Sequence, residues 1–131
     1  MLMAEINPTP SKHELLEAFH QAWCAMSSAS PRQWSPENAA WGQCAVTALV
    51  VQDYWGGELL RGQMPSDSHY WNRLDDGQAE DFTLGQFAHP PTFSDVSIRT
   101  RETLLANEGT KSRYNILVER VKMFLAKGHD A

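Results

Sequence analysis

The sequence has few cysteines, no excess of basic residues and no long hydrophobic run, and each absence excludes a class of protein. Among its 131 residues, eleven Lys and Arg stand against sixteen Asp and Glu, for a net charge of -5. No segment concentrates enough base to follow a phosphate backbone, so we expect no nucleic-acid partner. No run approaches the roughly 20 apolar residues that span a bilayer, and residues 1–10 lack the pattern of a signal peptide. These absences predict a cytoplasmic protein that does not bind a membrane.

The two cysteines, Cys24 and Cys44, are too few for a disulfide framework. In a cytoplasmic protein thiols stay reduced, so we expect both to be free. The five histidines are scattered and, with two isolated cysteines, do not have the spacing of zinc ligands. We therefore expect no metal and no cofactor, although Cys44, His69 and Asp81 could bind adventitious zinc if folding brings them together. No glycine-rich phosphate loop is present either.

The length and composition are those of one ordinary globular domain. Hydrophobic residues make up 42% of the chain and charged residues 21%, which is far from the signature of disorder. A chain of this length can bury one core and is too short to suggest two. We predict one α+β domain over residues 1–131.

Four segments are predicted to be helical. The first begins at a capping box, Ser11 to Glu14, and follows an apolar stripe through Trp23 to Met26. The second, residues 44–54, is apolar on nearly every side, which predicts a helix buried by its neighbours. A short helix is expected near residues 99–106. The last helix is predicted from a stripe that Gly128 should close: Tyr114, Leu117, Val118, Val121, Phe124 and Leu125.

The middle of the chain has the pattern of an antiparallel meander. Residues 58–63, 69–74 and 79–83 read as three short strands, the second of them rich in aromatic residues. Asp75-Asp76-Gly77-Gln78 is a strong turn signal between the last two strands. Residues 83–91 are expected to connect the meander to the final helices without a further strand.

Cys44 is the first candidate for a functional residue, because it begins the buried segment 44–54. At a helix N-terminus, unpaired N–H groups and the helix dipole favour the thiolate, which is the reactive form of cysteine. Gly42 leaves room for a substrate to approach, and Trp41 can shield the sulfur or form one wall of a groove. The alternative is that Cys44 is a plain core residue, since cysteine is among the most buried residue types.

His69 is the candidate partner of Cys44, because it opens a strand directly after a loop, where working side chains are often presented. A histidine near a thiol can take its proton and later return it to a leaving group. Asp81 lies across the predicted turn and can orient the His69 ring. Asp67 and Glu80 are rivals, and strand alternation allows only one of Glu80 and Asp81 on the face of His69. The alternative for His69 is a half-exposed strand residue without a role.

A family resemblance covers most of the chain. It rests on Trp41 to Tyr54, Gly56 to Leu59, His69 to Leu74 and Glu80 to Thr83, with Gln86-Phe87, Tyr114 and Arg120-Val121. In these segments the sequence resembles the YunG-like family of small bacterial proteins. This resemblance by itself implies no activity.

A broader resemblance is to the papain-like superfamily of thiol enzymes. It implies N-terminal helices with a buried helix that begins at the nucleophilic cysteine, then a small antiparallel sheet that supplies His and Asp, then C-terminal helices. Cys44, His69 and Asp81 occur in that order. The sequence departs from papain in lacking a Gln several residues before the cysteine and the small-residue and Trp pattern after it. The Gln43 side chain and the Cys44 backbone N–H are therefore the candidate oxyanion donors.

Two functions of different classes follow from these residues. The first is a thiol hydrolase or acyltransferase that acts on an amide or acyl bond of a peptide or small molecule through Cys44, His69 and Asp81. Specificity would lie in residues 30–40 and 64–68. The second is a non-catalytic domain that binds a peptide or small molecule in a groove lined by tryptophans: Trp34, Trp41, Trp55 and Trp71. A third, weaker hypothesis is a component of a toxin-immunity or effector system, which rests only on small size and a bacterial thiol-enzyme pattern.

Overall fold

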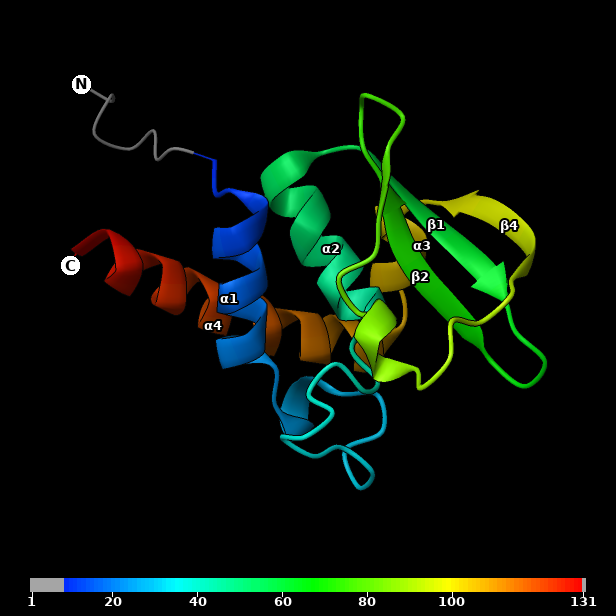
Figure 1. Ribbon diagram of the computed structural model, residues 1–131, viewed down its shortest axis with the longest axis horizontal. Helices are drawn as coiled ribbons and strands as arrows, with labels where there is room; N and C mark the ends of the chain where they lie inside the picture. Colours follow the sequence, from blue (N-terminus) through cyan, green and yellow to red (C-terminus); the bar gives the residue numbers. More distant parts are fainter. Residues whose placement is uncertain (1–8, 131) are drawn as a thin grey trace.

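The structure is a computed structural model that describes residues 9–130, with side chains to residue 127. The helices and strands are α1 (Lys12–Ala22), η2 (Ala25–Ser27), α2 (Cys44–Trp55), β1 (Glu58–Gln63), β2 (Ser68–Arg73), β3 (Ala79–Glu80), η3 (Leu84–Gln86), β4 (Ser94–Arg99), α3 (Arg101–Leu105) and α4 (Glu108–Asp130). The fold is α+β, as predicted. Helices α1, α2 and α4 gather to one side of a four-stranded antiparallel sheet (Figure 1).

The capping box predicted for the first helix is present. The Ser11 side chain accepts a hydrogen bond from the Glu14 backbone N–H, and the Glu14 carboxylate accepts one from the Ser11 N–H. The predicted C-terminal end was wrong, because α1 stops at Ala22 and the chain continues into the short 3-10 helix η2. Met26, which the apolar stripe included, is 69% exposed. Trp23 ends the buried part of the stripe, since its indole N–H donates to Thr47 of α2 and holds the chain there.

Helix α2 is the centre of the hydrophobic core, as its apolar sequence predicts. Its residues from Val46 to Val51 are all buried. One side packs against α1 and α4 in the larger core cluster, and the other packs against β1 and α3 in a smaller cluster around Leu49 and Leu59. A helix packed on several sides cannot be amphipathic, which explains why the segment has no polar face.

The sheet has the strand order β3-β2-β1-β4. The predicted meander of β1, β2 and β3 is confirmed, and Gly62 of β1 is paired with His69 of β2. Strand β4 was not predicted. It pairs with β1 and forms an edge of the sheet. Its alternation of Val96 and Ile98 is a strand signal, but both side chains are more than half exposed, so the apolar face points to solvent and not into a core.

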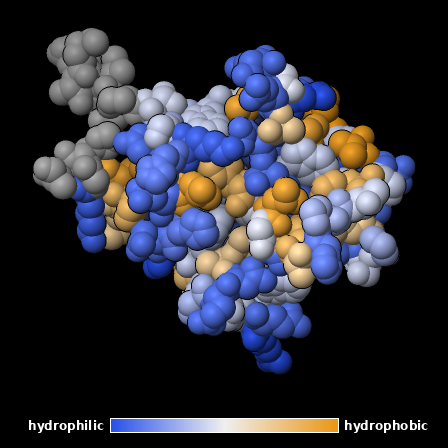
Figure 2. All heavy atoms as spheres, viewed as in Figure 1, coloured by the Kyte–Doolittle hydropathy of each residue, from blue (hydrophilic) through white to orange (hydrophobic). Residues whose placement is uncertain are grey.

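Helix α4 is longer than predicted. It begins at Glu108 and continues through Gly128 to Asp130, so Gly128 does not close it. The predicted stripe is confirmed, because Leu117, Val118 and Val121 are buried in the larger core cluster. On the face shown in Figure 2, hydrophobic residues reach the surface in separate small areas with hydrophilic residues between them. No helix in the described part of the chain is both long and apolar enough to cross a membrane.

Candidate active site

Cys44 is the first residue of α2, and the N-terminus of this helix has no side-chain cap. Helices α1 and α3 are different, because the side chains of Ser11 and Thr100 each accept a backbone N–H of the first turn. The first N–H groups of a helix have no acceptor within it. At α2 no residue of the cap uses its side chain to satisfy them, so they are left for another acceptor near the sulfur.

Gln43, a candidate oxyanion donor, has its side chain occupied elsewhere. The residue is fully buried, its amide nitrogen donates to the Cys24 carbonyl at 3.0 Å, and its amide oxygen accepts from the Ser27 hydroxyl at 2.9 Å. These bonds hold η2 against the start of α2. In this arrangement the Gln43 amide is not free to donate to a substrate.

His69 is buried on β2, with 1% of its surface exposed. Its Nε2 lies 2.6 Å from an Asp81 carboxylate oxygen. Burial alone would lower the pKa of His69, but hydrogen bonding to Asp81 and to Cys44, together with the charges of both, outweighs it and raises the pKa to about 9. The His69 ring is therefore mainly the imidazolium at neutral pH, and both Asp81 and Cys44 act on it.

The structure places Asp81, and neither rival carboxylate, beside His69. Asp81 follows β3 directly, and its second oxygen accepts hydrogen bonds from the backbone N–H and the hydroxyl of Thr83. Glu80 points elsewhere and forms an ion pair with Lys12 at 3.0 Å. Asp67 accepts the Ser68 backbone N–H. Asp81 therefore lies where the predicted turn was expected to bring it, although it follows β3 and is not part of the strand.

Aromatic rings pack against His69 on several sides. Trp71 and Phe93 stack against it at ring-centroid distances of 5.8 and 5.3 Å, and Phe87 meets it edge-on at 5.2 Å. Gly62 allows this packing, because a Cβ there would lie 2.8 Å from Phe93 and 2.9 Å from Trp71. Trp71, which the sequence suggested as a substrate contact, therefore supports the histidine ring.

A cavity of about 380 Å³ lies over Cys44 and His69, and both residues line it. The loop at residues 64–68 forms part of its wall, together with Trp41, Gln86 and Phe87. The indole N–H of Trp41 is buried and has no acceptor among the residues that the structure describes. The residues that line the cavity thus include a thiol, a histidine on a carboxylate and an indole whose N–H has no partner among the described residues.

The other tryptophans of the predicted groove do not gather at this cavity. The Trp34 indole donates to the Ala39 carbonyl within its own loop, and the Trp55 indole donates to the Pro10 carbonyl beside the core. Gly42 lines the cavity, but the reason that position 42 requires glycine is its own backbone conformation and close packing. Its φ is +74°, and a Cβ would lie 2.3 Å from the Ser28 hydroxyl. The sequence had attributed Gly42 to substrate access, whereas the structure shows close backbone packing.

Comparison with known proteins gives a family. The chain matches the YunG protein family over residues 11–126. The chain belongs to this family. It is also 34% identical over 85 residues to a Bacillus subtilis (strain 168) protein described as "Uncharacterized protein YunG", a match covering 65% of this chain and 70% of that protein. No solved structure matches the chain.

Several cavity residues of this YunG family member were not singled out from its sequence. Thr110 and Arg113 reach the cavity from the first turns of α4, far along the chain from Cys44. Gln86 accepts the Gly42 backbone N–H and donates to the Thr83 carbonyl, so it ties η3 to the loop before α2. No local pattern in the sequence marks Arg113 for this position, because tertiary packing brings α4 to the cavity.

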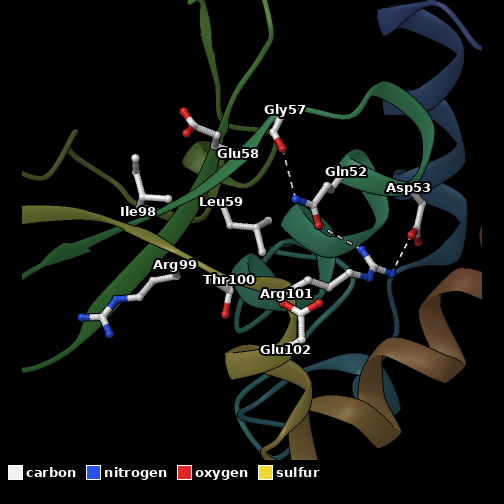
Figure 3. A pocket seen from close by; sticks show the side chains of 10 residues that line it. All are labelled: Gln52, Asp53, Gly57, Glu58, Leu59, Ile98, Arg99, Thr100, Arg101 and Glu102. Atoms are coloured by element: carbon white, nitrogen blue, oxygen red, sulfur yellow. Dashed lines mark hydrogen bonds and ion pairs between the residues drawn. The ribbon is translucent and has the colours of Figure 1, made fainter.

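A larger hollow of about 590 Å³ lies elsewhere, between α2, the edge of the sheet and α3 (Figure 3). Arg101 crosses it, donating to the Leu49 carbonyl, to Gln52, and to Asp53 at 2.6 Å. Tyr114 donates to Asp53 and accepts from Arg101. Burial first, then the hydrogen bond to Asp53, raises the pKa of Tyr114 to about 12. These groups satisfy one another and join α2, α3 and α4.

Among the described residues, no group of three or more His, Cys, Asp or Glu side chains is placed to hold a metal ion. Both cysteines are free and partly buried. Cys24 does not lie late in a helix as expected, but just after α1, where its sulfur is 3.7 Å from the Ser27 hydroxyl. The two cysteines are thus both partly buried and have different neighbours.

Proposed function

We propose that this YunG family member is a thiol hydrolase or acyltransferase that acts on an amide or acyl bond. Cys44 is the nucleophile, His69 is the acid and base, and Asp81 holds His69. The observation that carries the proposal is His69 itself, which is buried, bonded to Asp81 at 2.6 Å, influenced by Cys44 and part of the wall of the same cavity as Cys44. The papain-like arrangement of these parts and a reducing, cytoplasmic setting belong to the proposal as well.

In the first step the Cys44 sulfur attacks the carbonyl carbon of the substrate, and a carbon–sulfur bond forms. Because Asp81 occupies Nε2 of His69, the Nδ1 proton is the one passed to the leaving group. The carbon–nitrogen bond of an amide then breaks, an amine leaves with the His69 proton, and a thioester remains on Cys44.

The oxygen of the attacked carbonyl gains negative charge and needs hydrogen-bond donors. The Cys44 backbone N–H is at the uncapped start of α2, and the Trp41 indole N–H is buried at the cavity without an acceptor among the described residues. The Cys44 N–H is a preorganised donor of the kind that stabilises an oxyanion, and the Trp41 N–H would join it once the substrate displaces the atoms that cover it. Trp41 takes the role that the sequence had suggested for the Gln43 side chain.

In the second step a water or an amine attacks the thioester. His69, now neutral, takes a proton from the attacking group, the carbon–sulfur bond breaks, and Cys44 returns to its starting form. Attack by water gives hydrolysis or deamidation, and attack by an amine gives acyl transfer. Residues 64–68 lie on the cavity wall, so their side chains would determine substrate specificity.

Timed alkylation of the folded protein tests the proposal without knowledge of the substrate. At neutral pH, iodoacetamide should modify Cys44 about tenfold faster than Cys24, because reactivity follows thiolate fraction and access. Since both thiols are partly buried, a difference in rate would report their chemical surroundings. Mass spectrometry of proteolytic fragments measures the two rates in one sample.

His69→Ala should remove most of this preference, and Asp81→Ala should reduce it less, because Asp81 acts through the orientation of His69. Circular dichroism would show whether each variant stays folded. Slow, equal labelling of both cysteines, unchanged by His69→Ala, would reject a catalytic role for Cys44. A cavity that only binds its ligand would then be the better description.

A further inference from the structure

Arg113 is a cation on the wall of the cavity that contains Cys44 and His69. Among the described residues it forms no ion pair with any carboxylate, although Arg73 and Arg101 each have one. Its Nε is buried and has no hydrogen-bond acceptor among those residues. The residue as a whole is only partly buried and lines the cavity, so the rest of its guanidinium can meet a ligand there, and a cation without a carboxylate partner favours an anionic ligand.

The local structure holds Arg113 in this position. Its guanidinium turns back over the first turn of α4, where one nitrogen donates to the Thr110 hydroxyl at 3.3 Å. Gly109 makes room for it, since a Cβ there would lie 2.9 Å from another guanidinium nitrogen. The start of α4 is itself positive, which strengthens the attraction for an anion. Thr110, which also lines the cavity, supplies a hydroxyl beside the cation.

We propose that Arg113, with Thr110, binds a carboxylate of the substrate, so that the acyl or amide compound attacked by Cys44 carries a free carboxylate group. This inference rests on the proposed function for the reaction, but the binding site is independent of it. The planar guanidinium fork matches a carboxylate in shape. A single arginine in a cavity that Asp67 also lines suits one negative charge better than a phosphate dianion.

The charge of an alkylating reagent tests this subsite. Iodoacetate carries a carboxylate and iodoacetamide does not, while both deliver the same carbon to a thiol. The ratio of their rates at Cys44, divided by the same ratio at Cys24 in the same molecule, measures the attraction for the carboxylate. We expect Arg113→Gln to lower this normalised ratio about tenfold, the value of one charge-assisted hydrogen bond. Arg113→Lys should lower it less.

Lys111→Gln is the matched control, because it removes one positive charge from an exposed position two residues away on the same helix. It should change the ratio by less than about twofold, since an exposed charge is screened by solvent. An equal fall in both variants would mean a general field effect and would overturn the subsite. An unchanged ratio in Arg113→Gln, with Cys44 still reacting quickly with iodoacetamide, would overturn the subsite and leave the proposed function in place.

A binding measurement keeps the test valid if Cys44 proves unreactive. In a nitrogen-15 spectrum, the Arg113 Nε–H signal, assigned by its loss in Arg113→Lys, should shift when N-acetylglycine is added. N-acetylglycinamide, which lacks the carboxylate, should leave it in place. No shift with either compound would overturn the subsite whatever Cys44 does. A stronger shift with inorganic phosphate than with N-acetylglycine would overturn the carboxylate assignment.

Discussion

The cavity over Cys44 and the hollow crossed by Arg101 both contain an arginine and a carboxylate, but they use them differently. In the hollow, Arg101 donates to Asp53 (Figure 3). Tyr114 of α4 donates to the same carboxylate and accepts from Arg101, so the three groups satisfy one another. In the cavity, the indole N–H of Trp41 and the Nε of Arg113 have no acceptor among the described residues. The hollow is the larger of the two, at about 590 Å³ against 380 Å³.

On this difference we base the expectation that unused hydrogen-bonding groups mark a binding site better than volume does. Groups that satisfy one another contribute to stability, as the Arg101 network does by joining three helices. Buried donors without acceptors reduce stability, so a fold that keeps them is expected to use them for a ligand. The comparison therefore predicts that the hollow contributes to stability and that the cavity binds a ligand.

The sharpest expected difference between the two regions is the pH range in which each affects stability. His69 has a pKa of about 9 in the folded protein, above its usual value. The charged ring therefore contributes its whole stabilising free energy below pH 6.5, and this contribution is lost as the pH rises through 9. The free energy of unfolding should fall by up to about 3 kcal/mol over this range. Asp81→Asn should flatten the fall, as measured by urea unfolding at several pH values.

Asp53→Asn is the control in the hollow. Tyr114, with its pKa raised to about 12, keeps its proton throughout the range of His69, and its own contribution is lost only above pH 10. Asp53→Asn should therefore lower stability without changing the slope between pH 6.5 and 9. If Asp53→Asn reduces the pH dependence of the free energy of unfolding as much as Asp81→Asn does, His69 is not the group that causes it.

A smaller effect is expected from breaking the network in the hollow. Arg101→Met removes hydrogen bonds to α2 and α4 and leaves Asp53 without its cation, so the free energy of unfolding should fall by about 2 kcal/mol. The rate of Cys44 alkylation should stay the same. Arg73→Met breaks an exposed ion pair with Glu58 and should cost less than about 1 kcal/mol. Loss of Cys44 reactivity in the folded Arg101→Met variant would show that the regions are coupled.

The smallest expected effect tests the aromatic rings around His69. Gly62→Ala places a methyl group against Phe93 and Trp71, so the His69 ring should shift and Cys44 alkylation should slow about threefold. Gly85→Ala is the control, since a Cβ at Gly85 meets nothing within 4 Å. If both variants alkylate Cys44 at the wild-type rate, the rings do not position His69.

Local patterns in the chain predicted much of the fold. The capping box at Ser11, the apolar segment of α2 and the turn after β2 each depend on neighbouring residues, and each was confirmed. Strand β4 and the early end of α1 were not predicted. Both depend on distant partners, because β4 is held by β1 and the chain after α1 is held by Thr47 and Gln43.

The sequence by itself determined that Cys44 begins a buried helix and that Asp81 lies across a hairpin from His69, because turn and periodicity signals fix short-range geometry. Only the tertiary structure decided the rest of the site. It turned the Gln43 amide toward η2, stacked Trp71 and Phe93 on His69, and brought Arg113 from α4 to the cavity. The physical reason is that side-chain partners far apart in the chain are chosen by packing, which a linear pattern does not record.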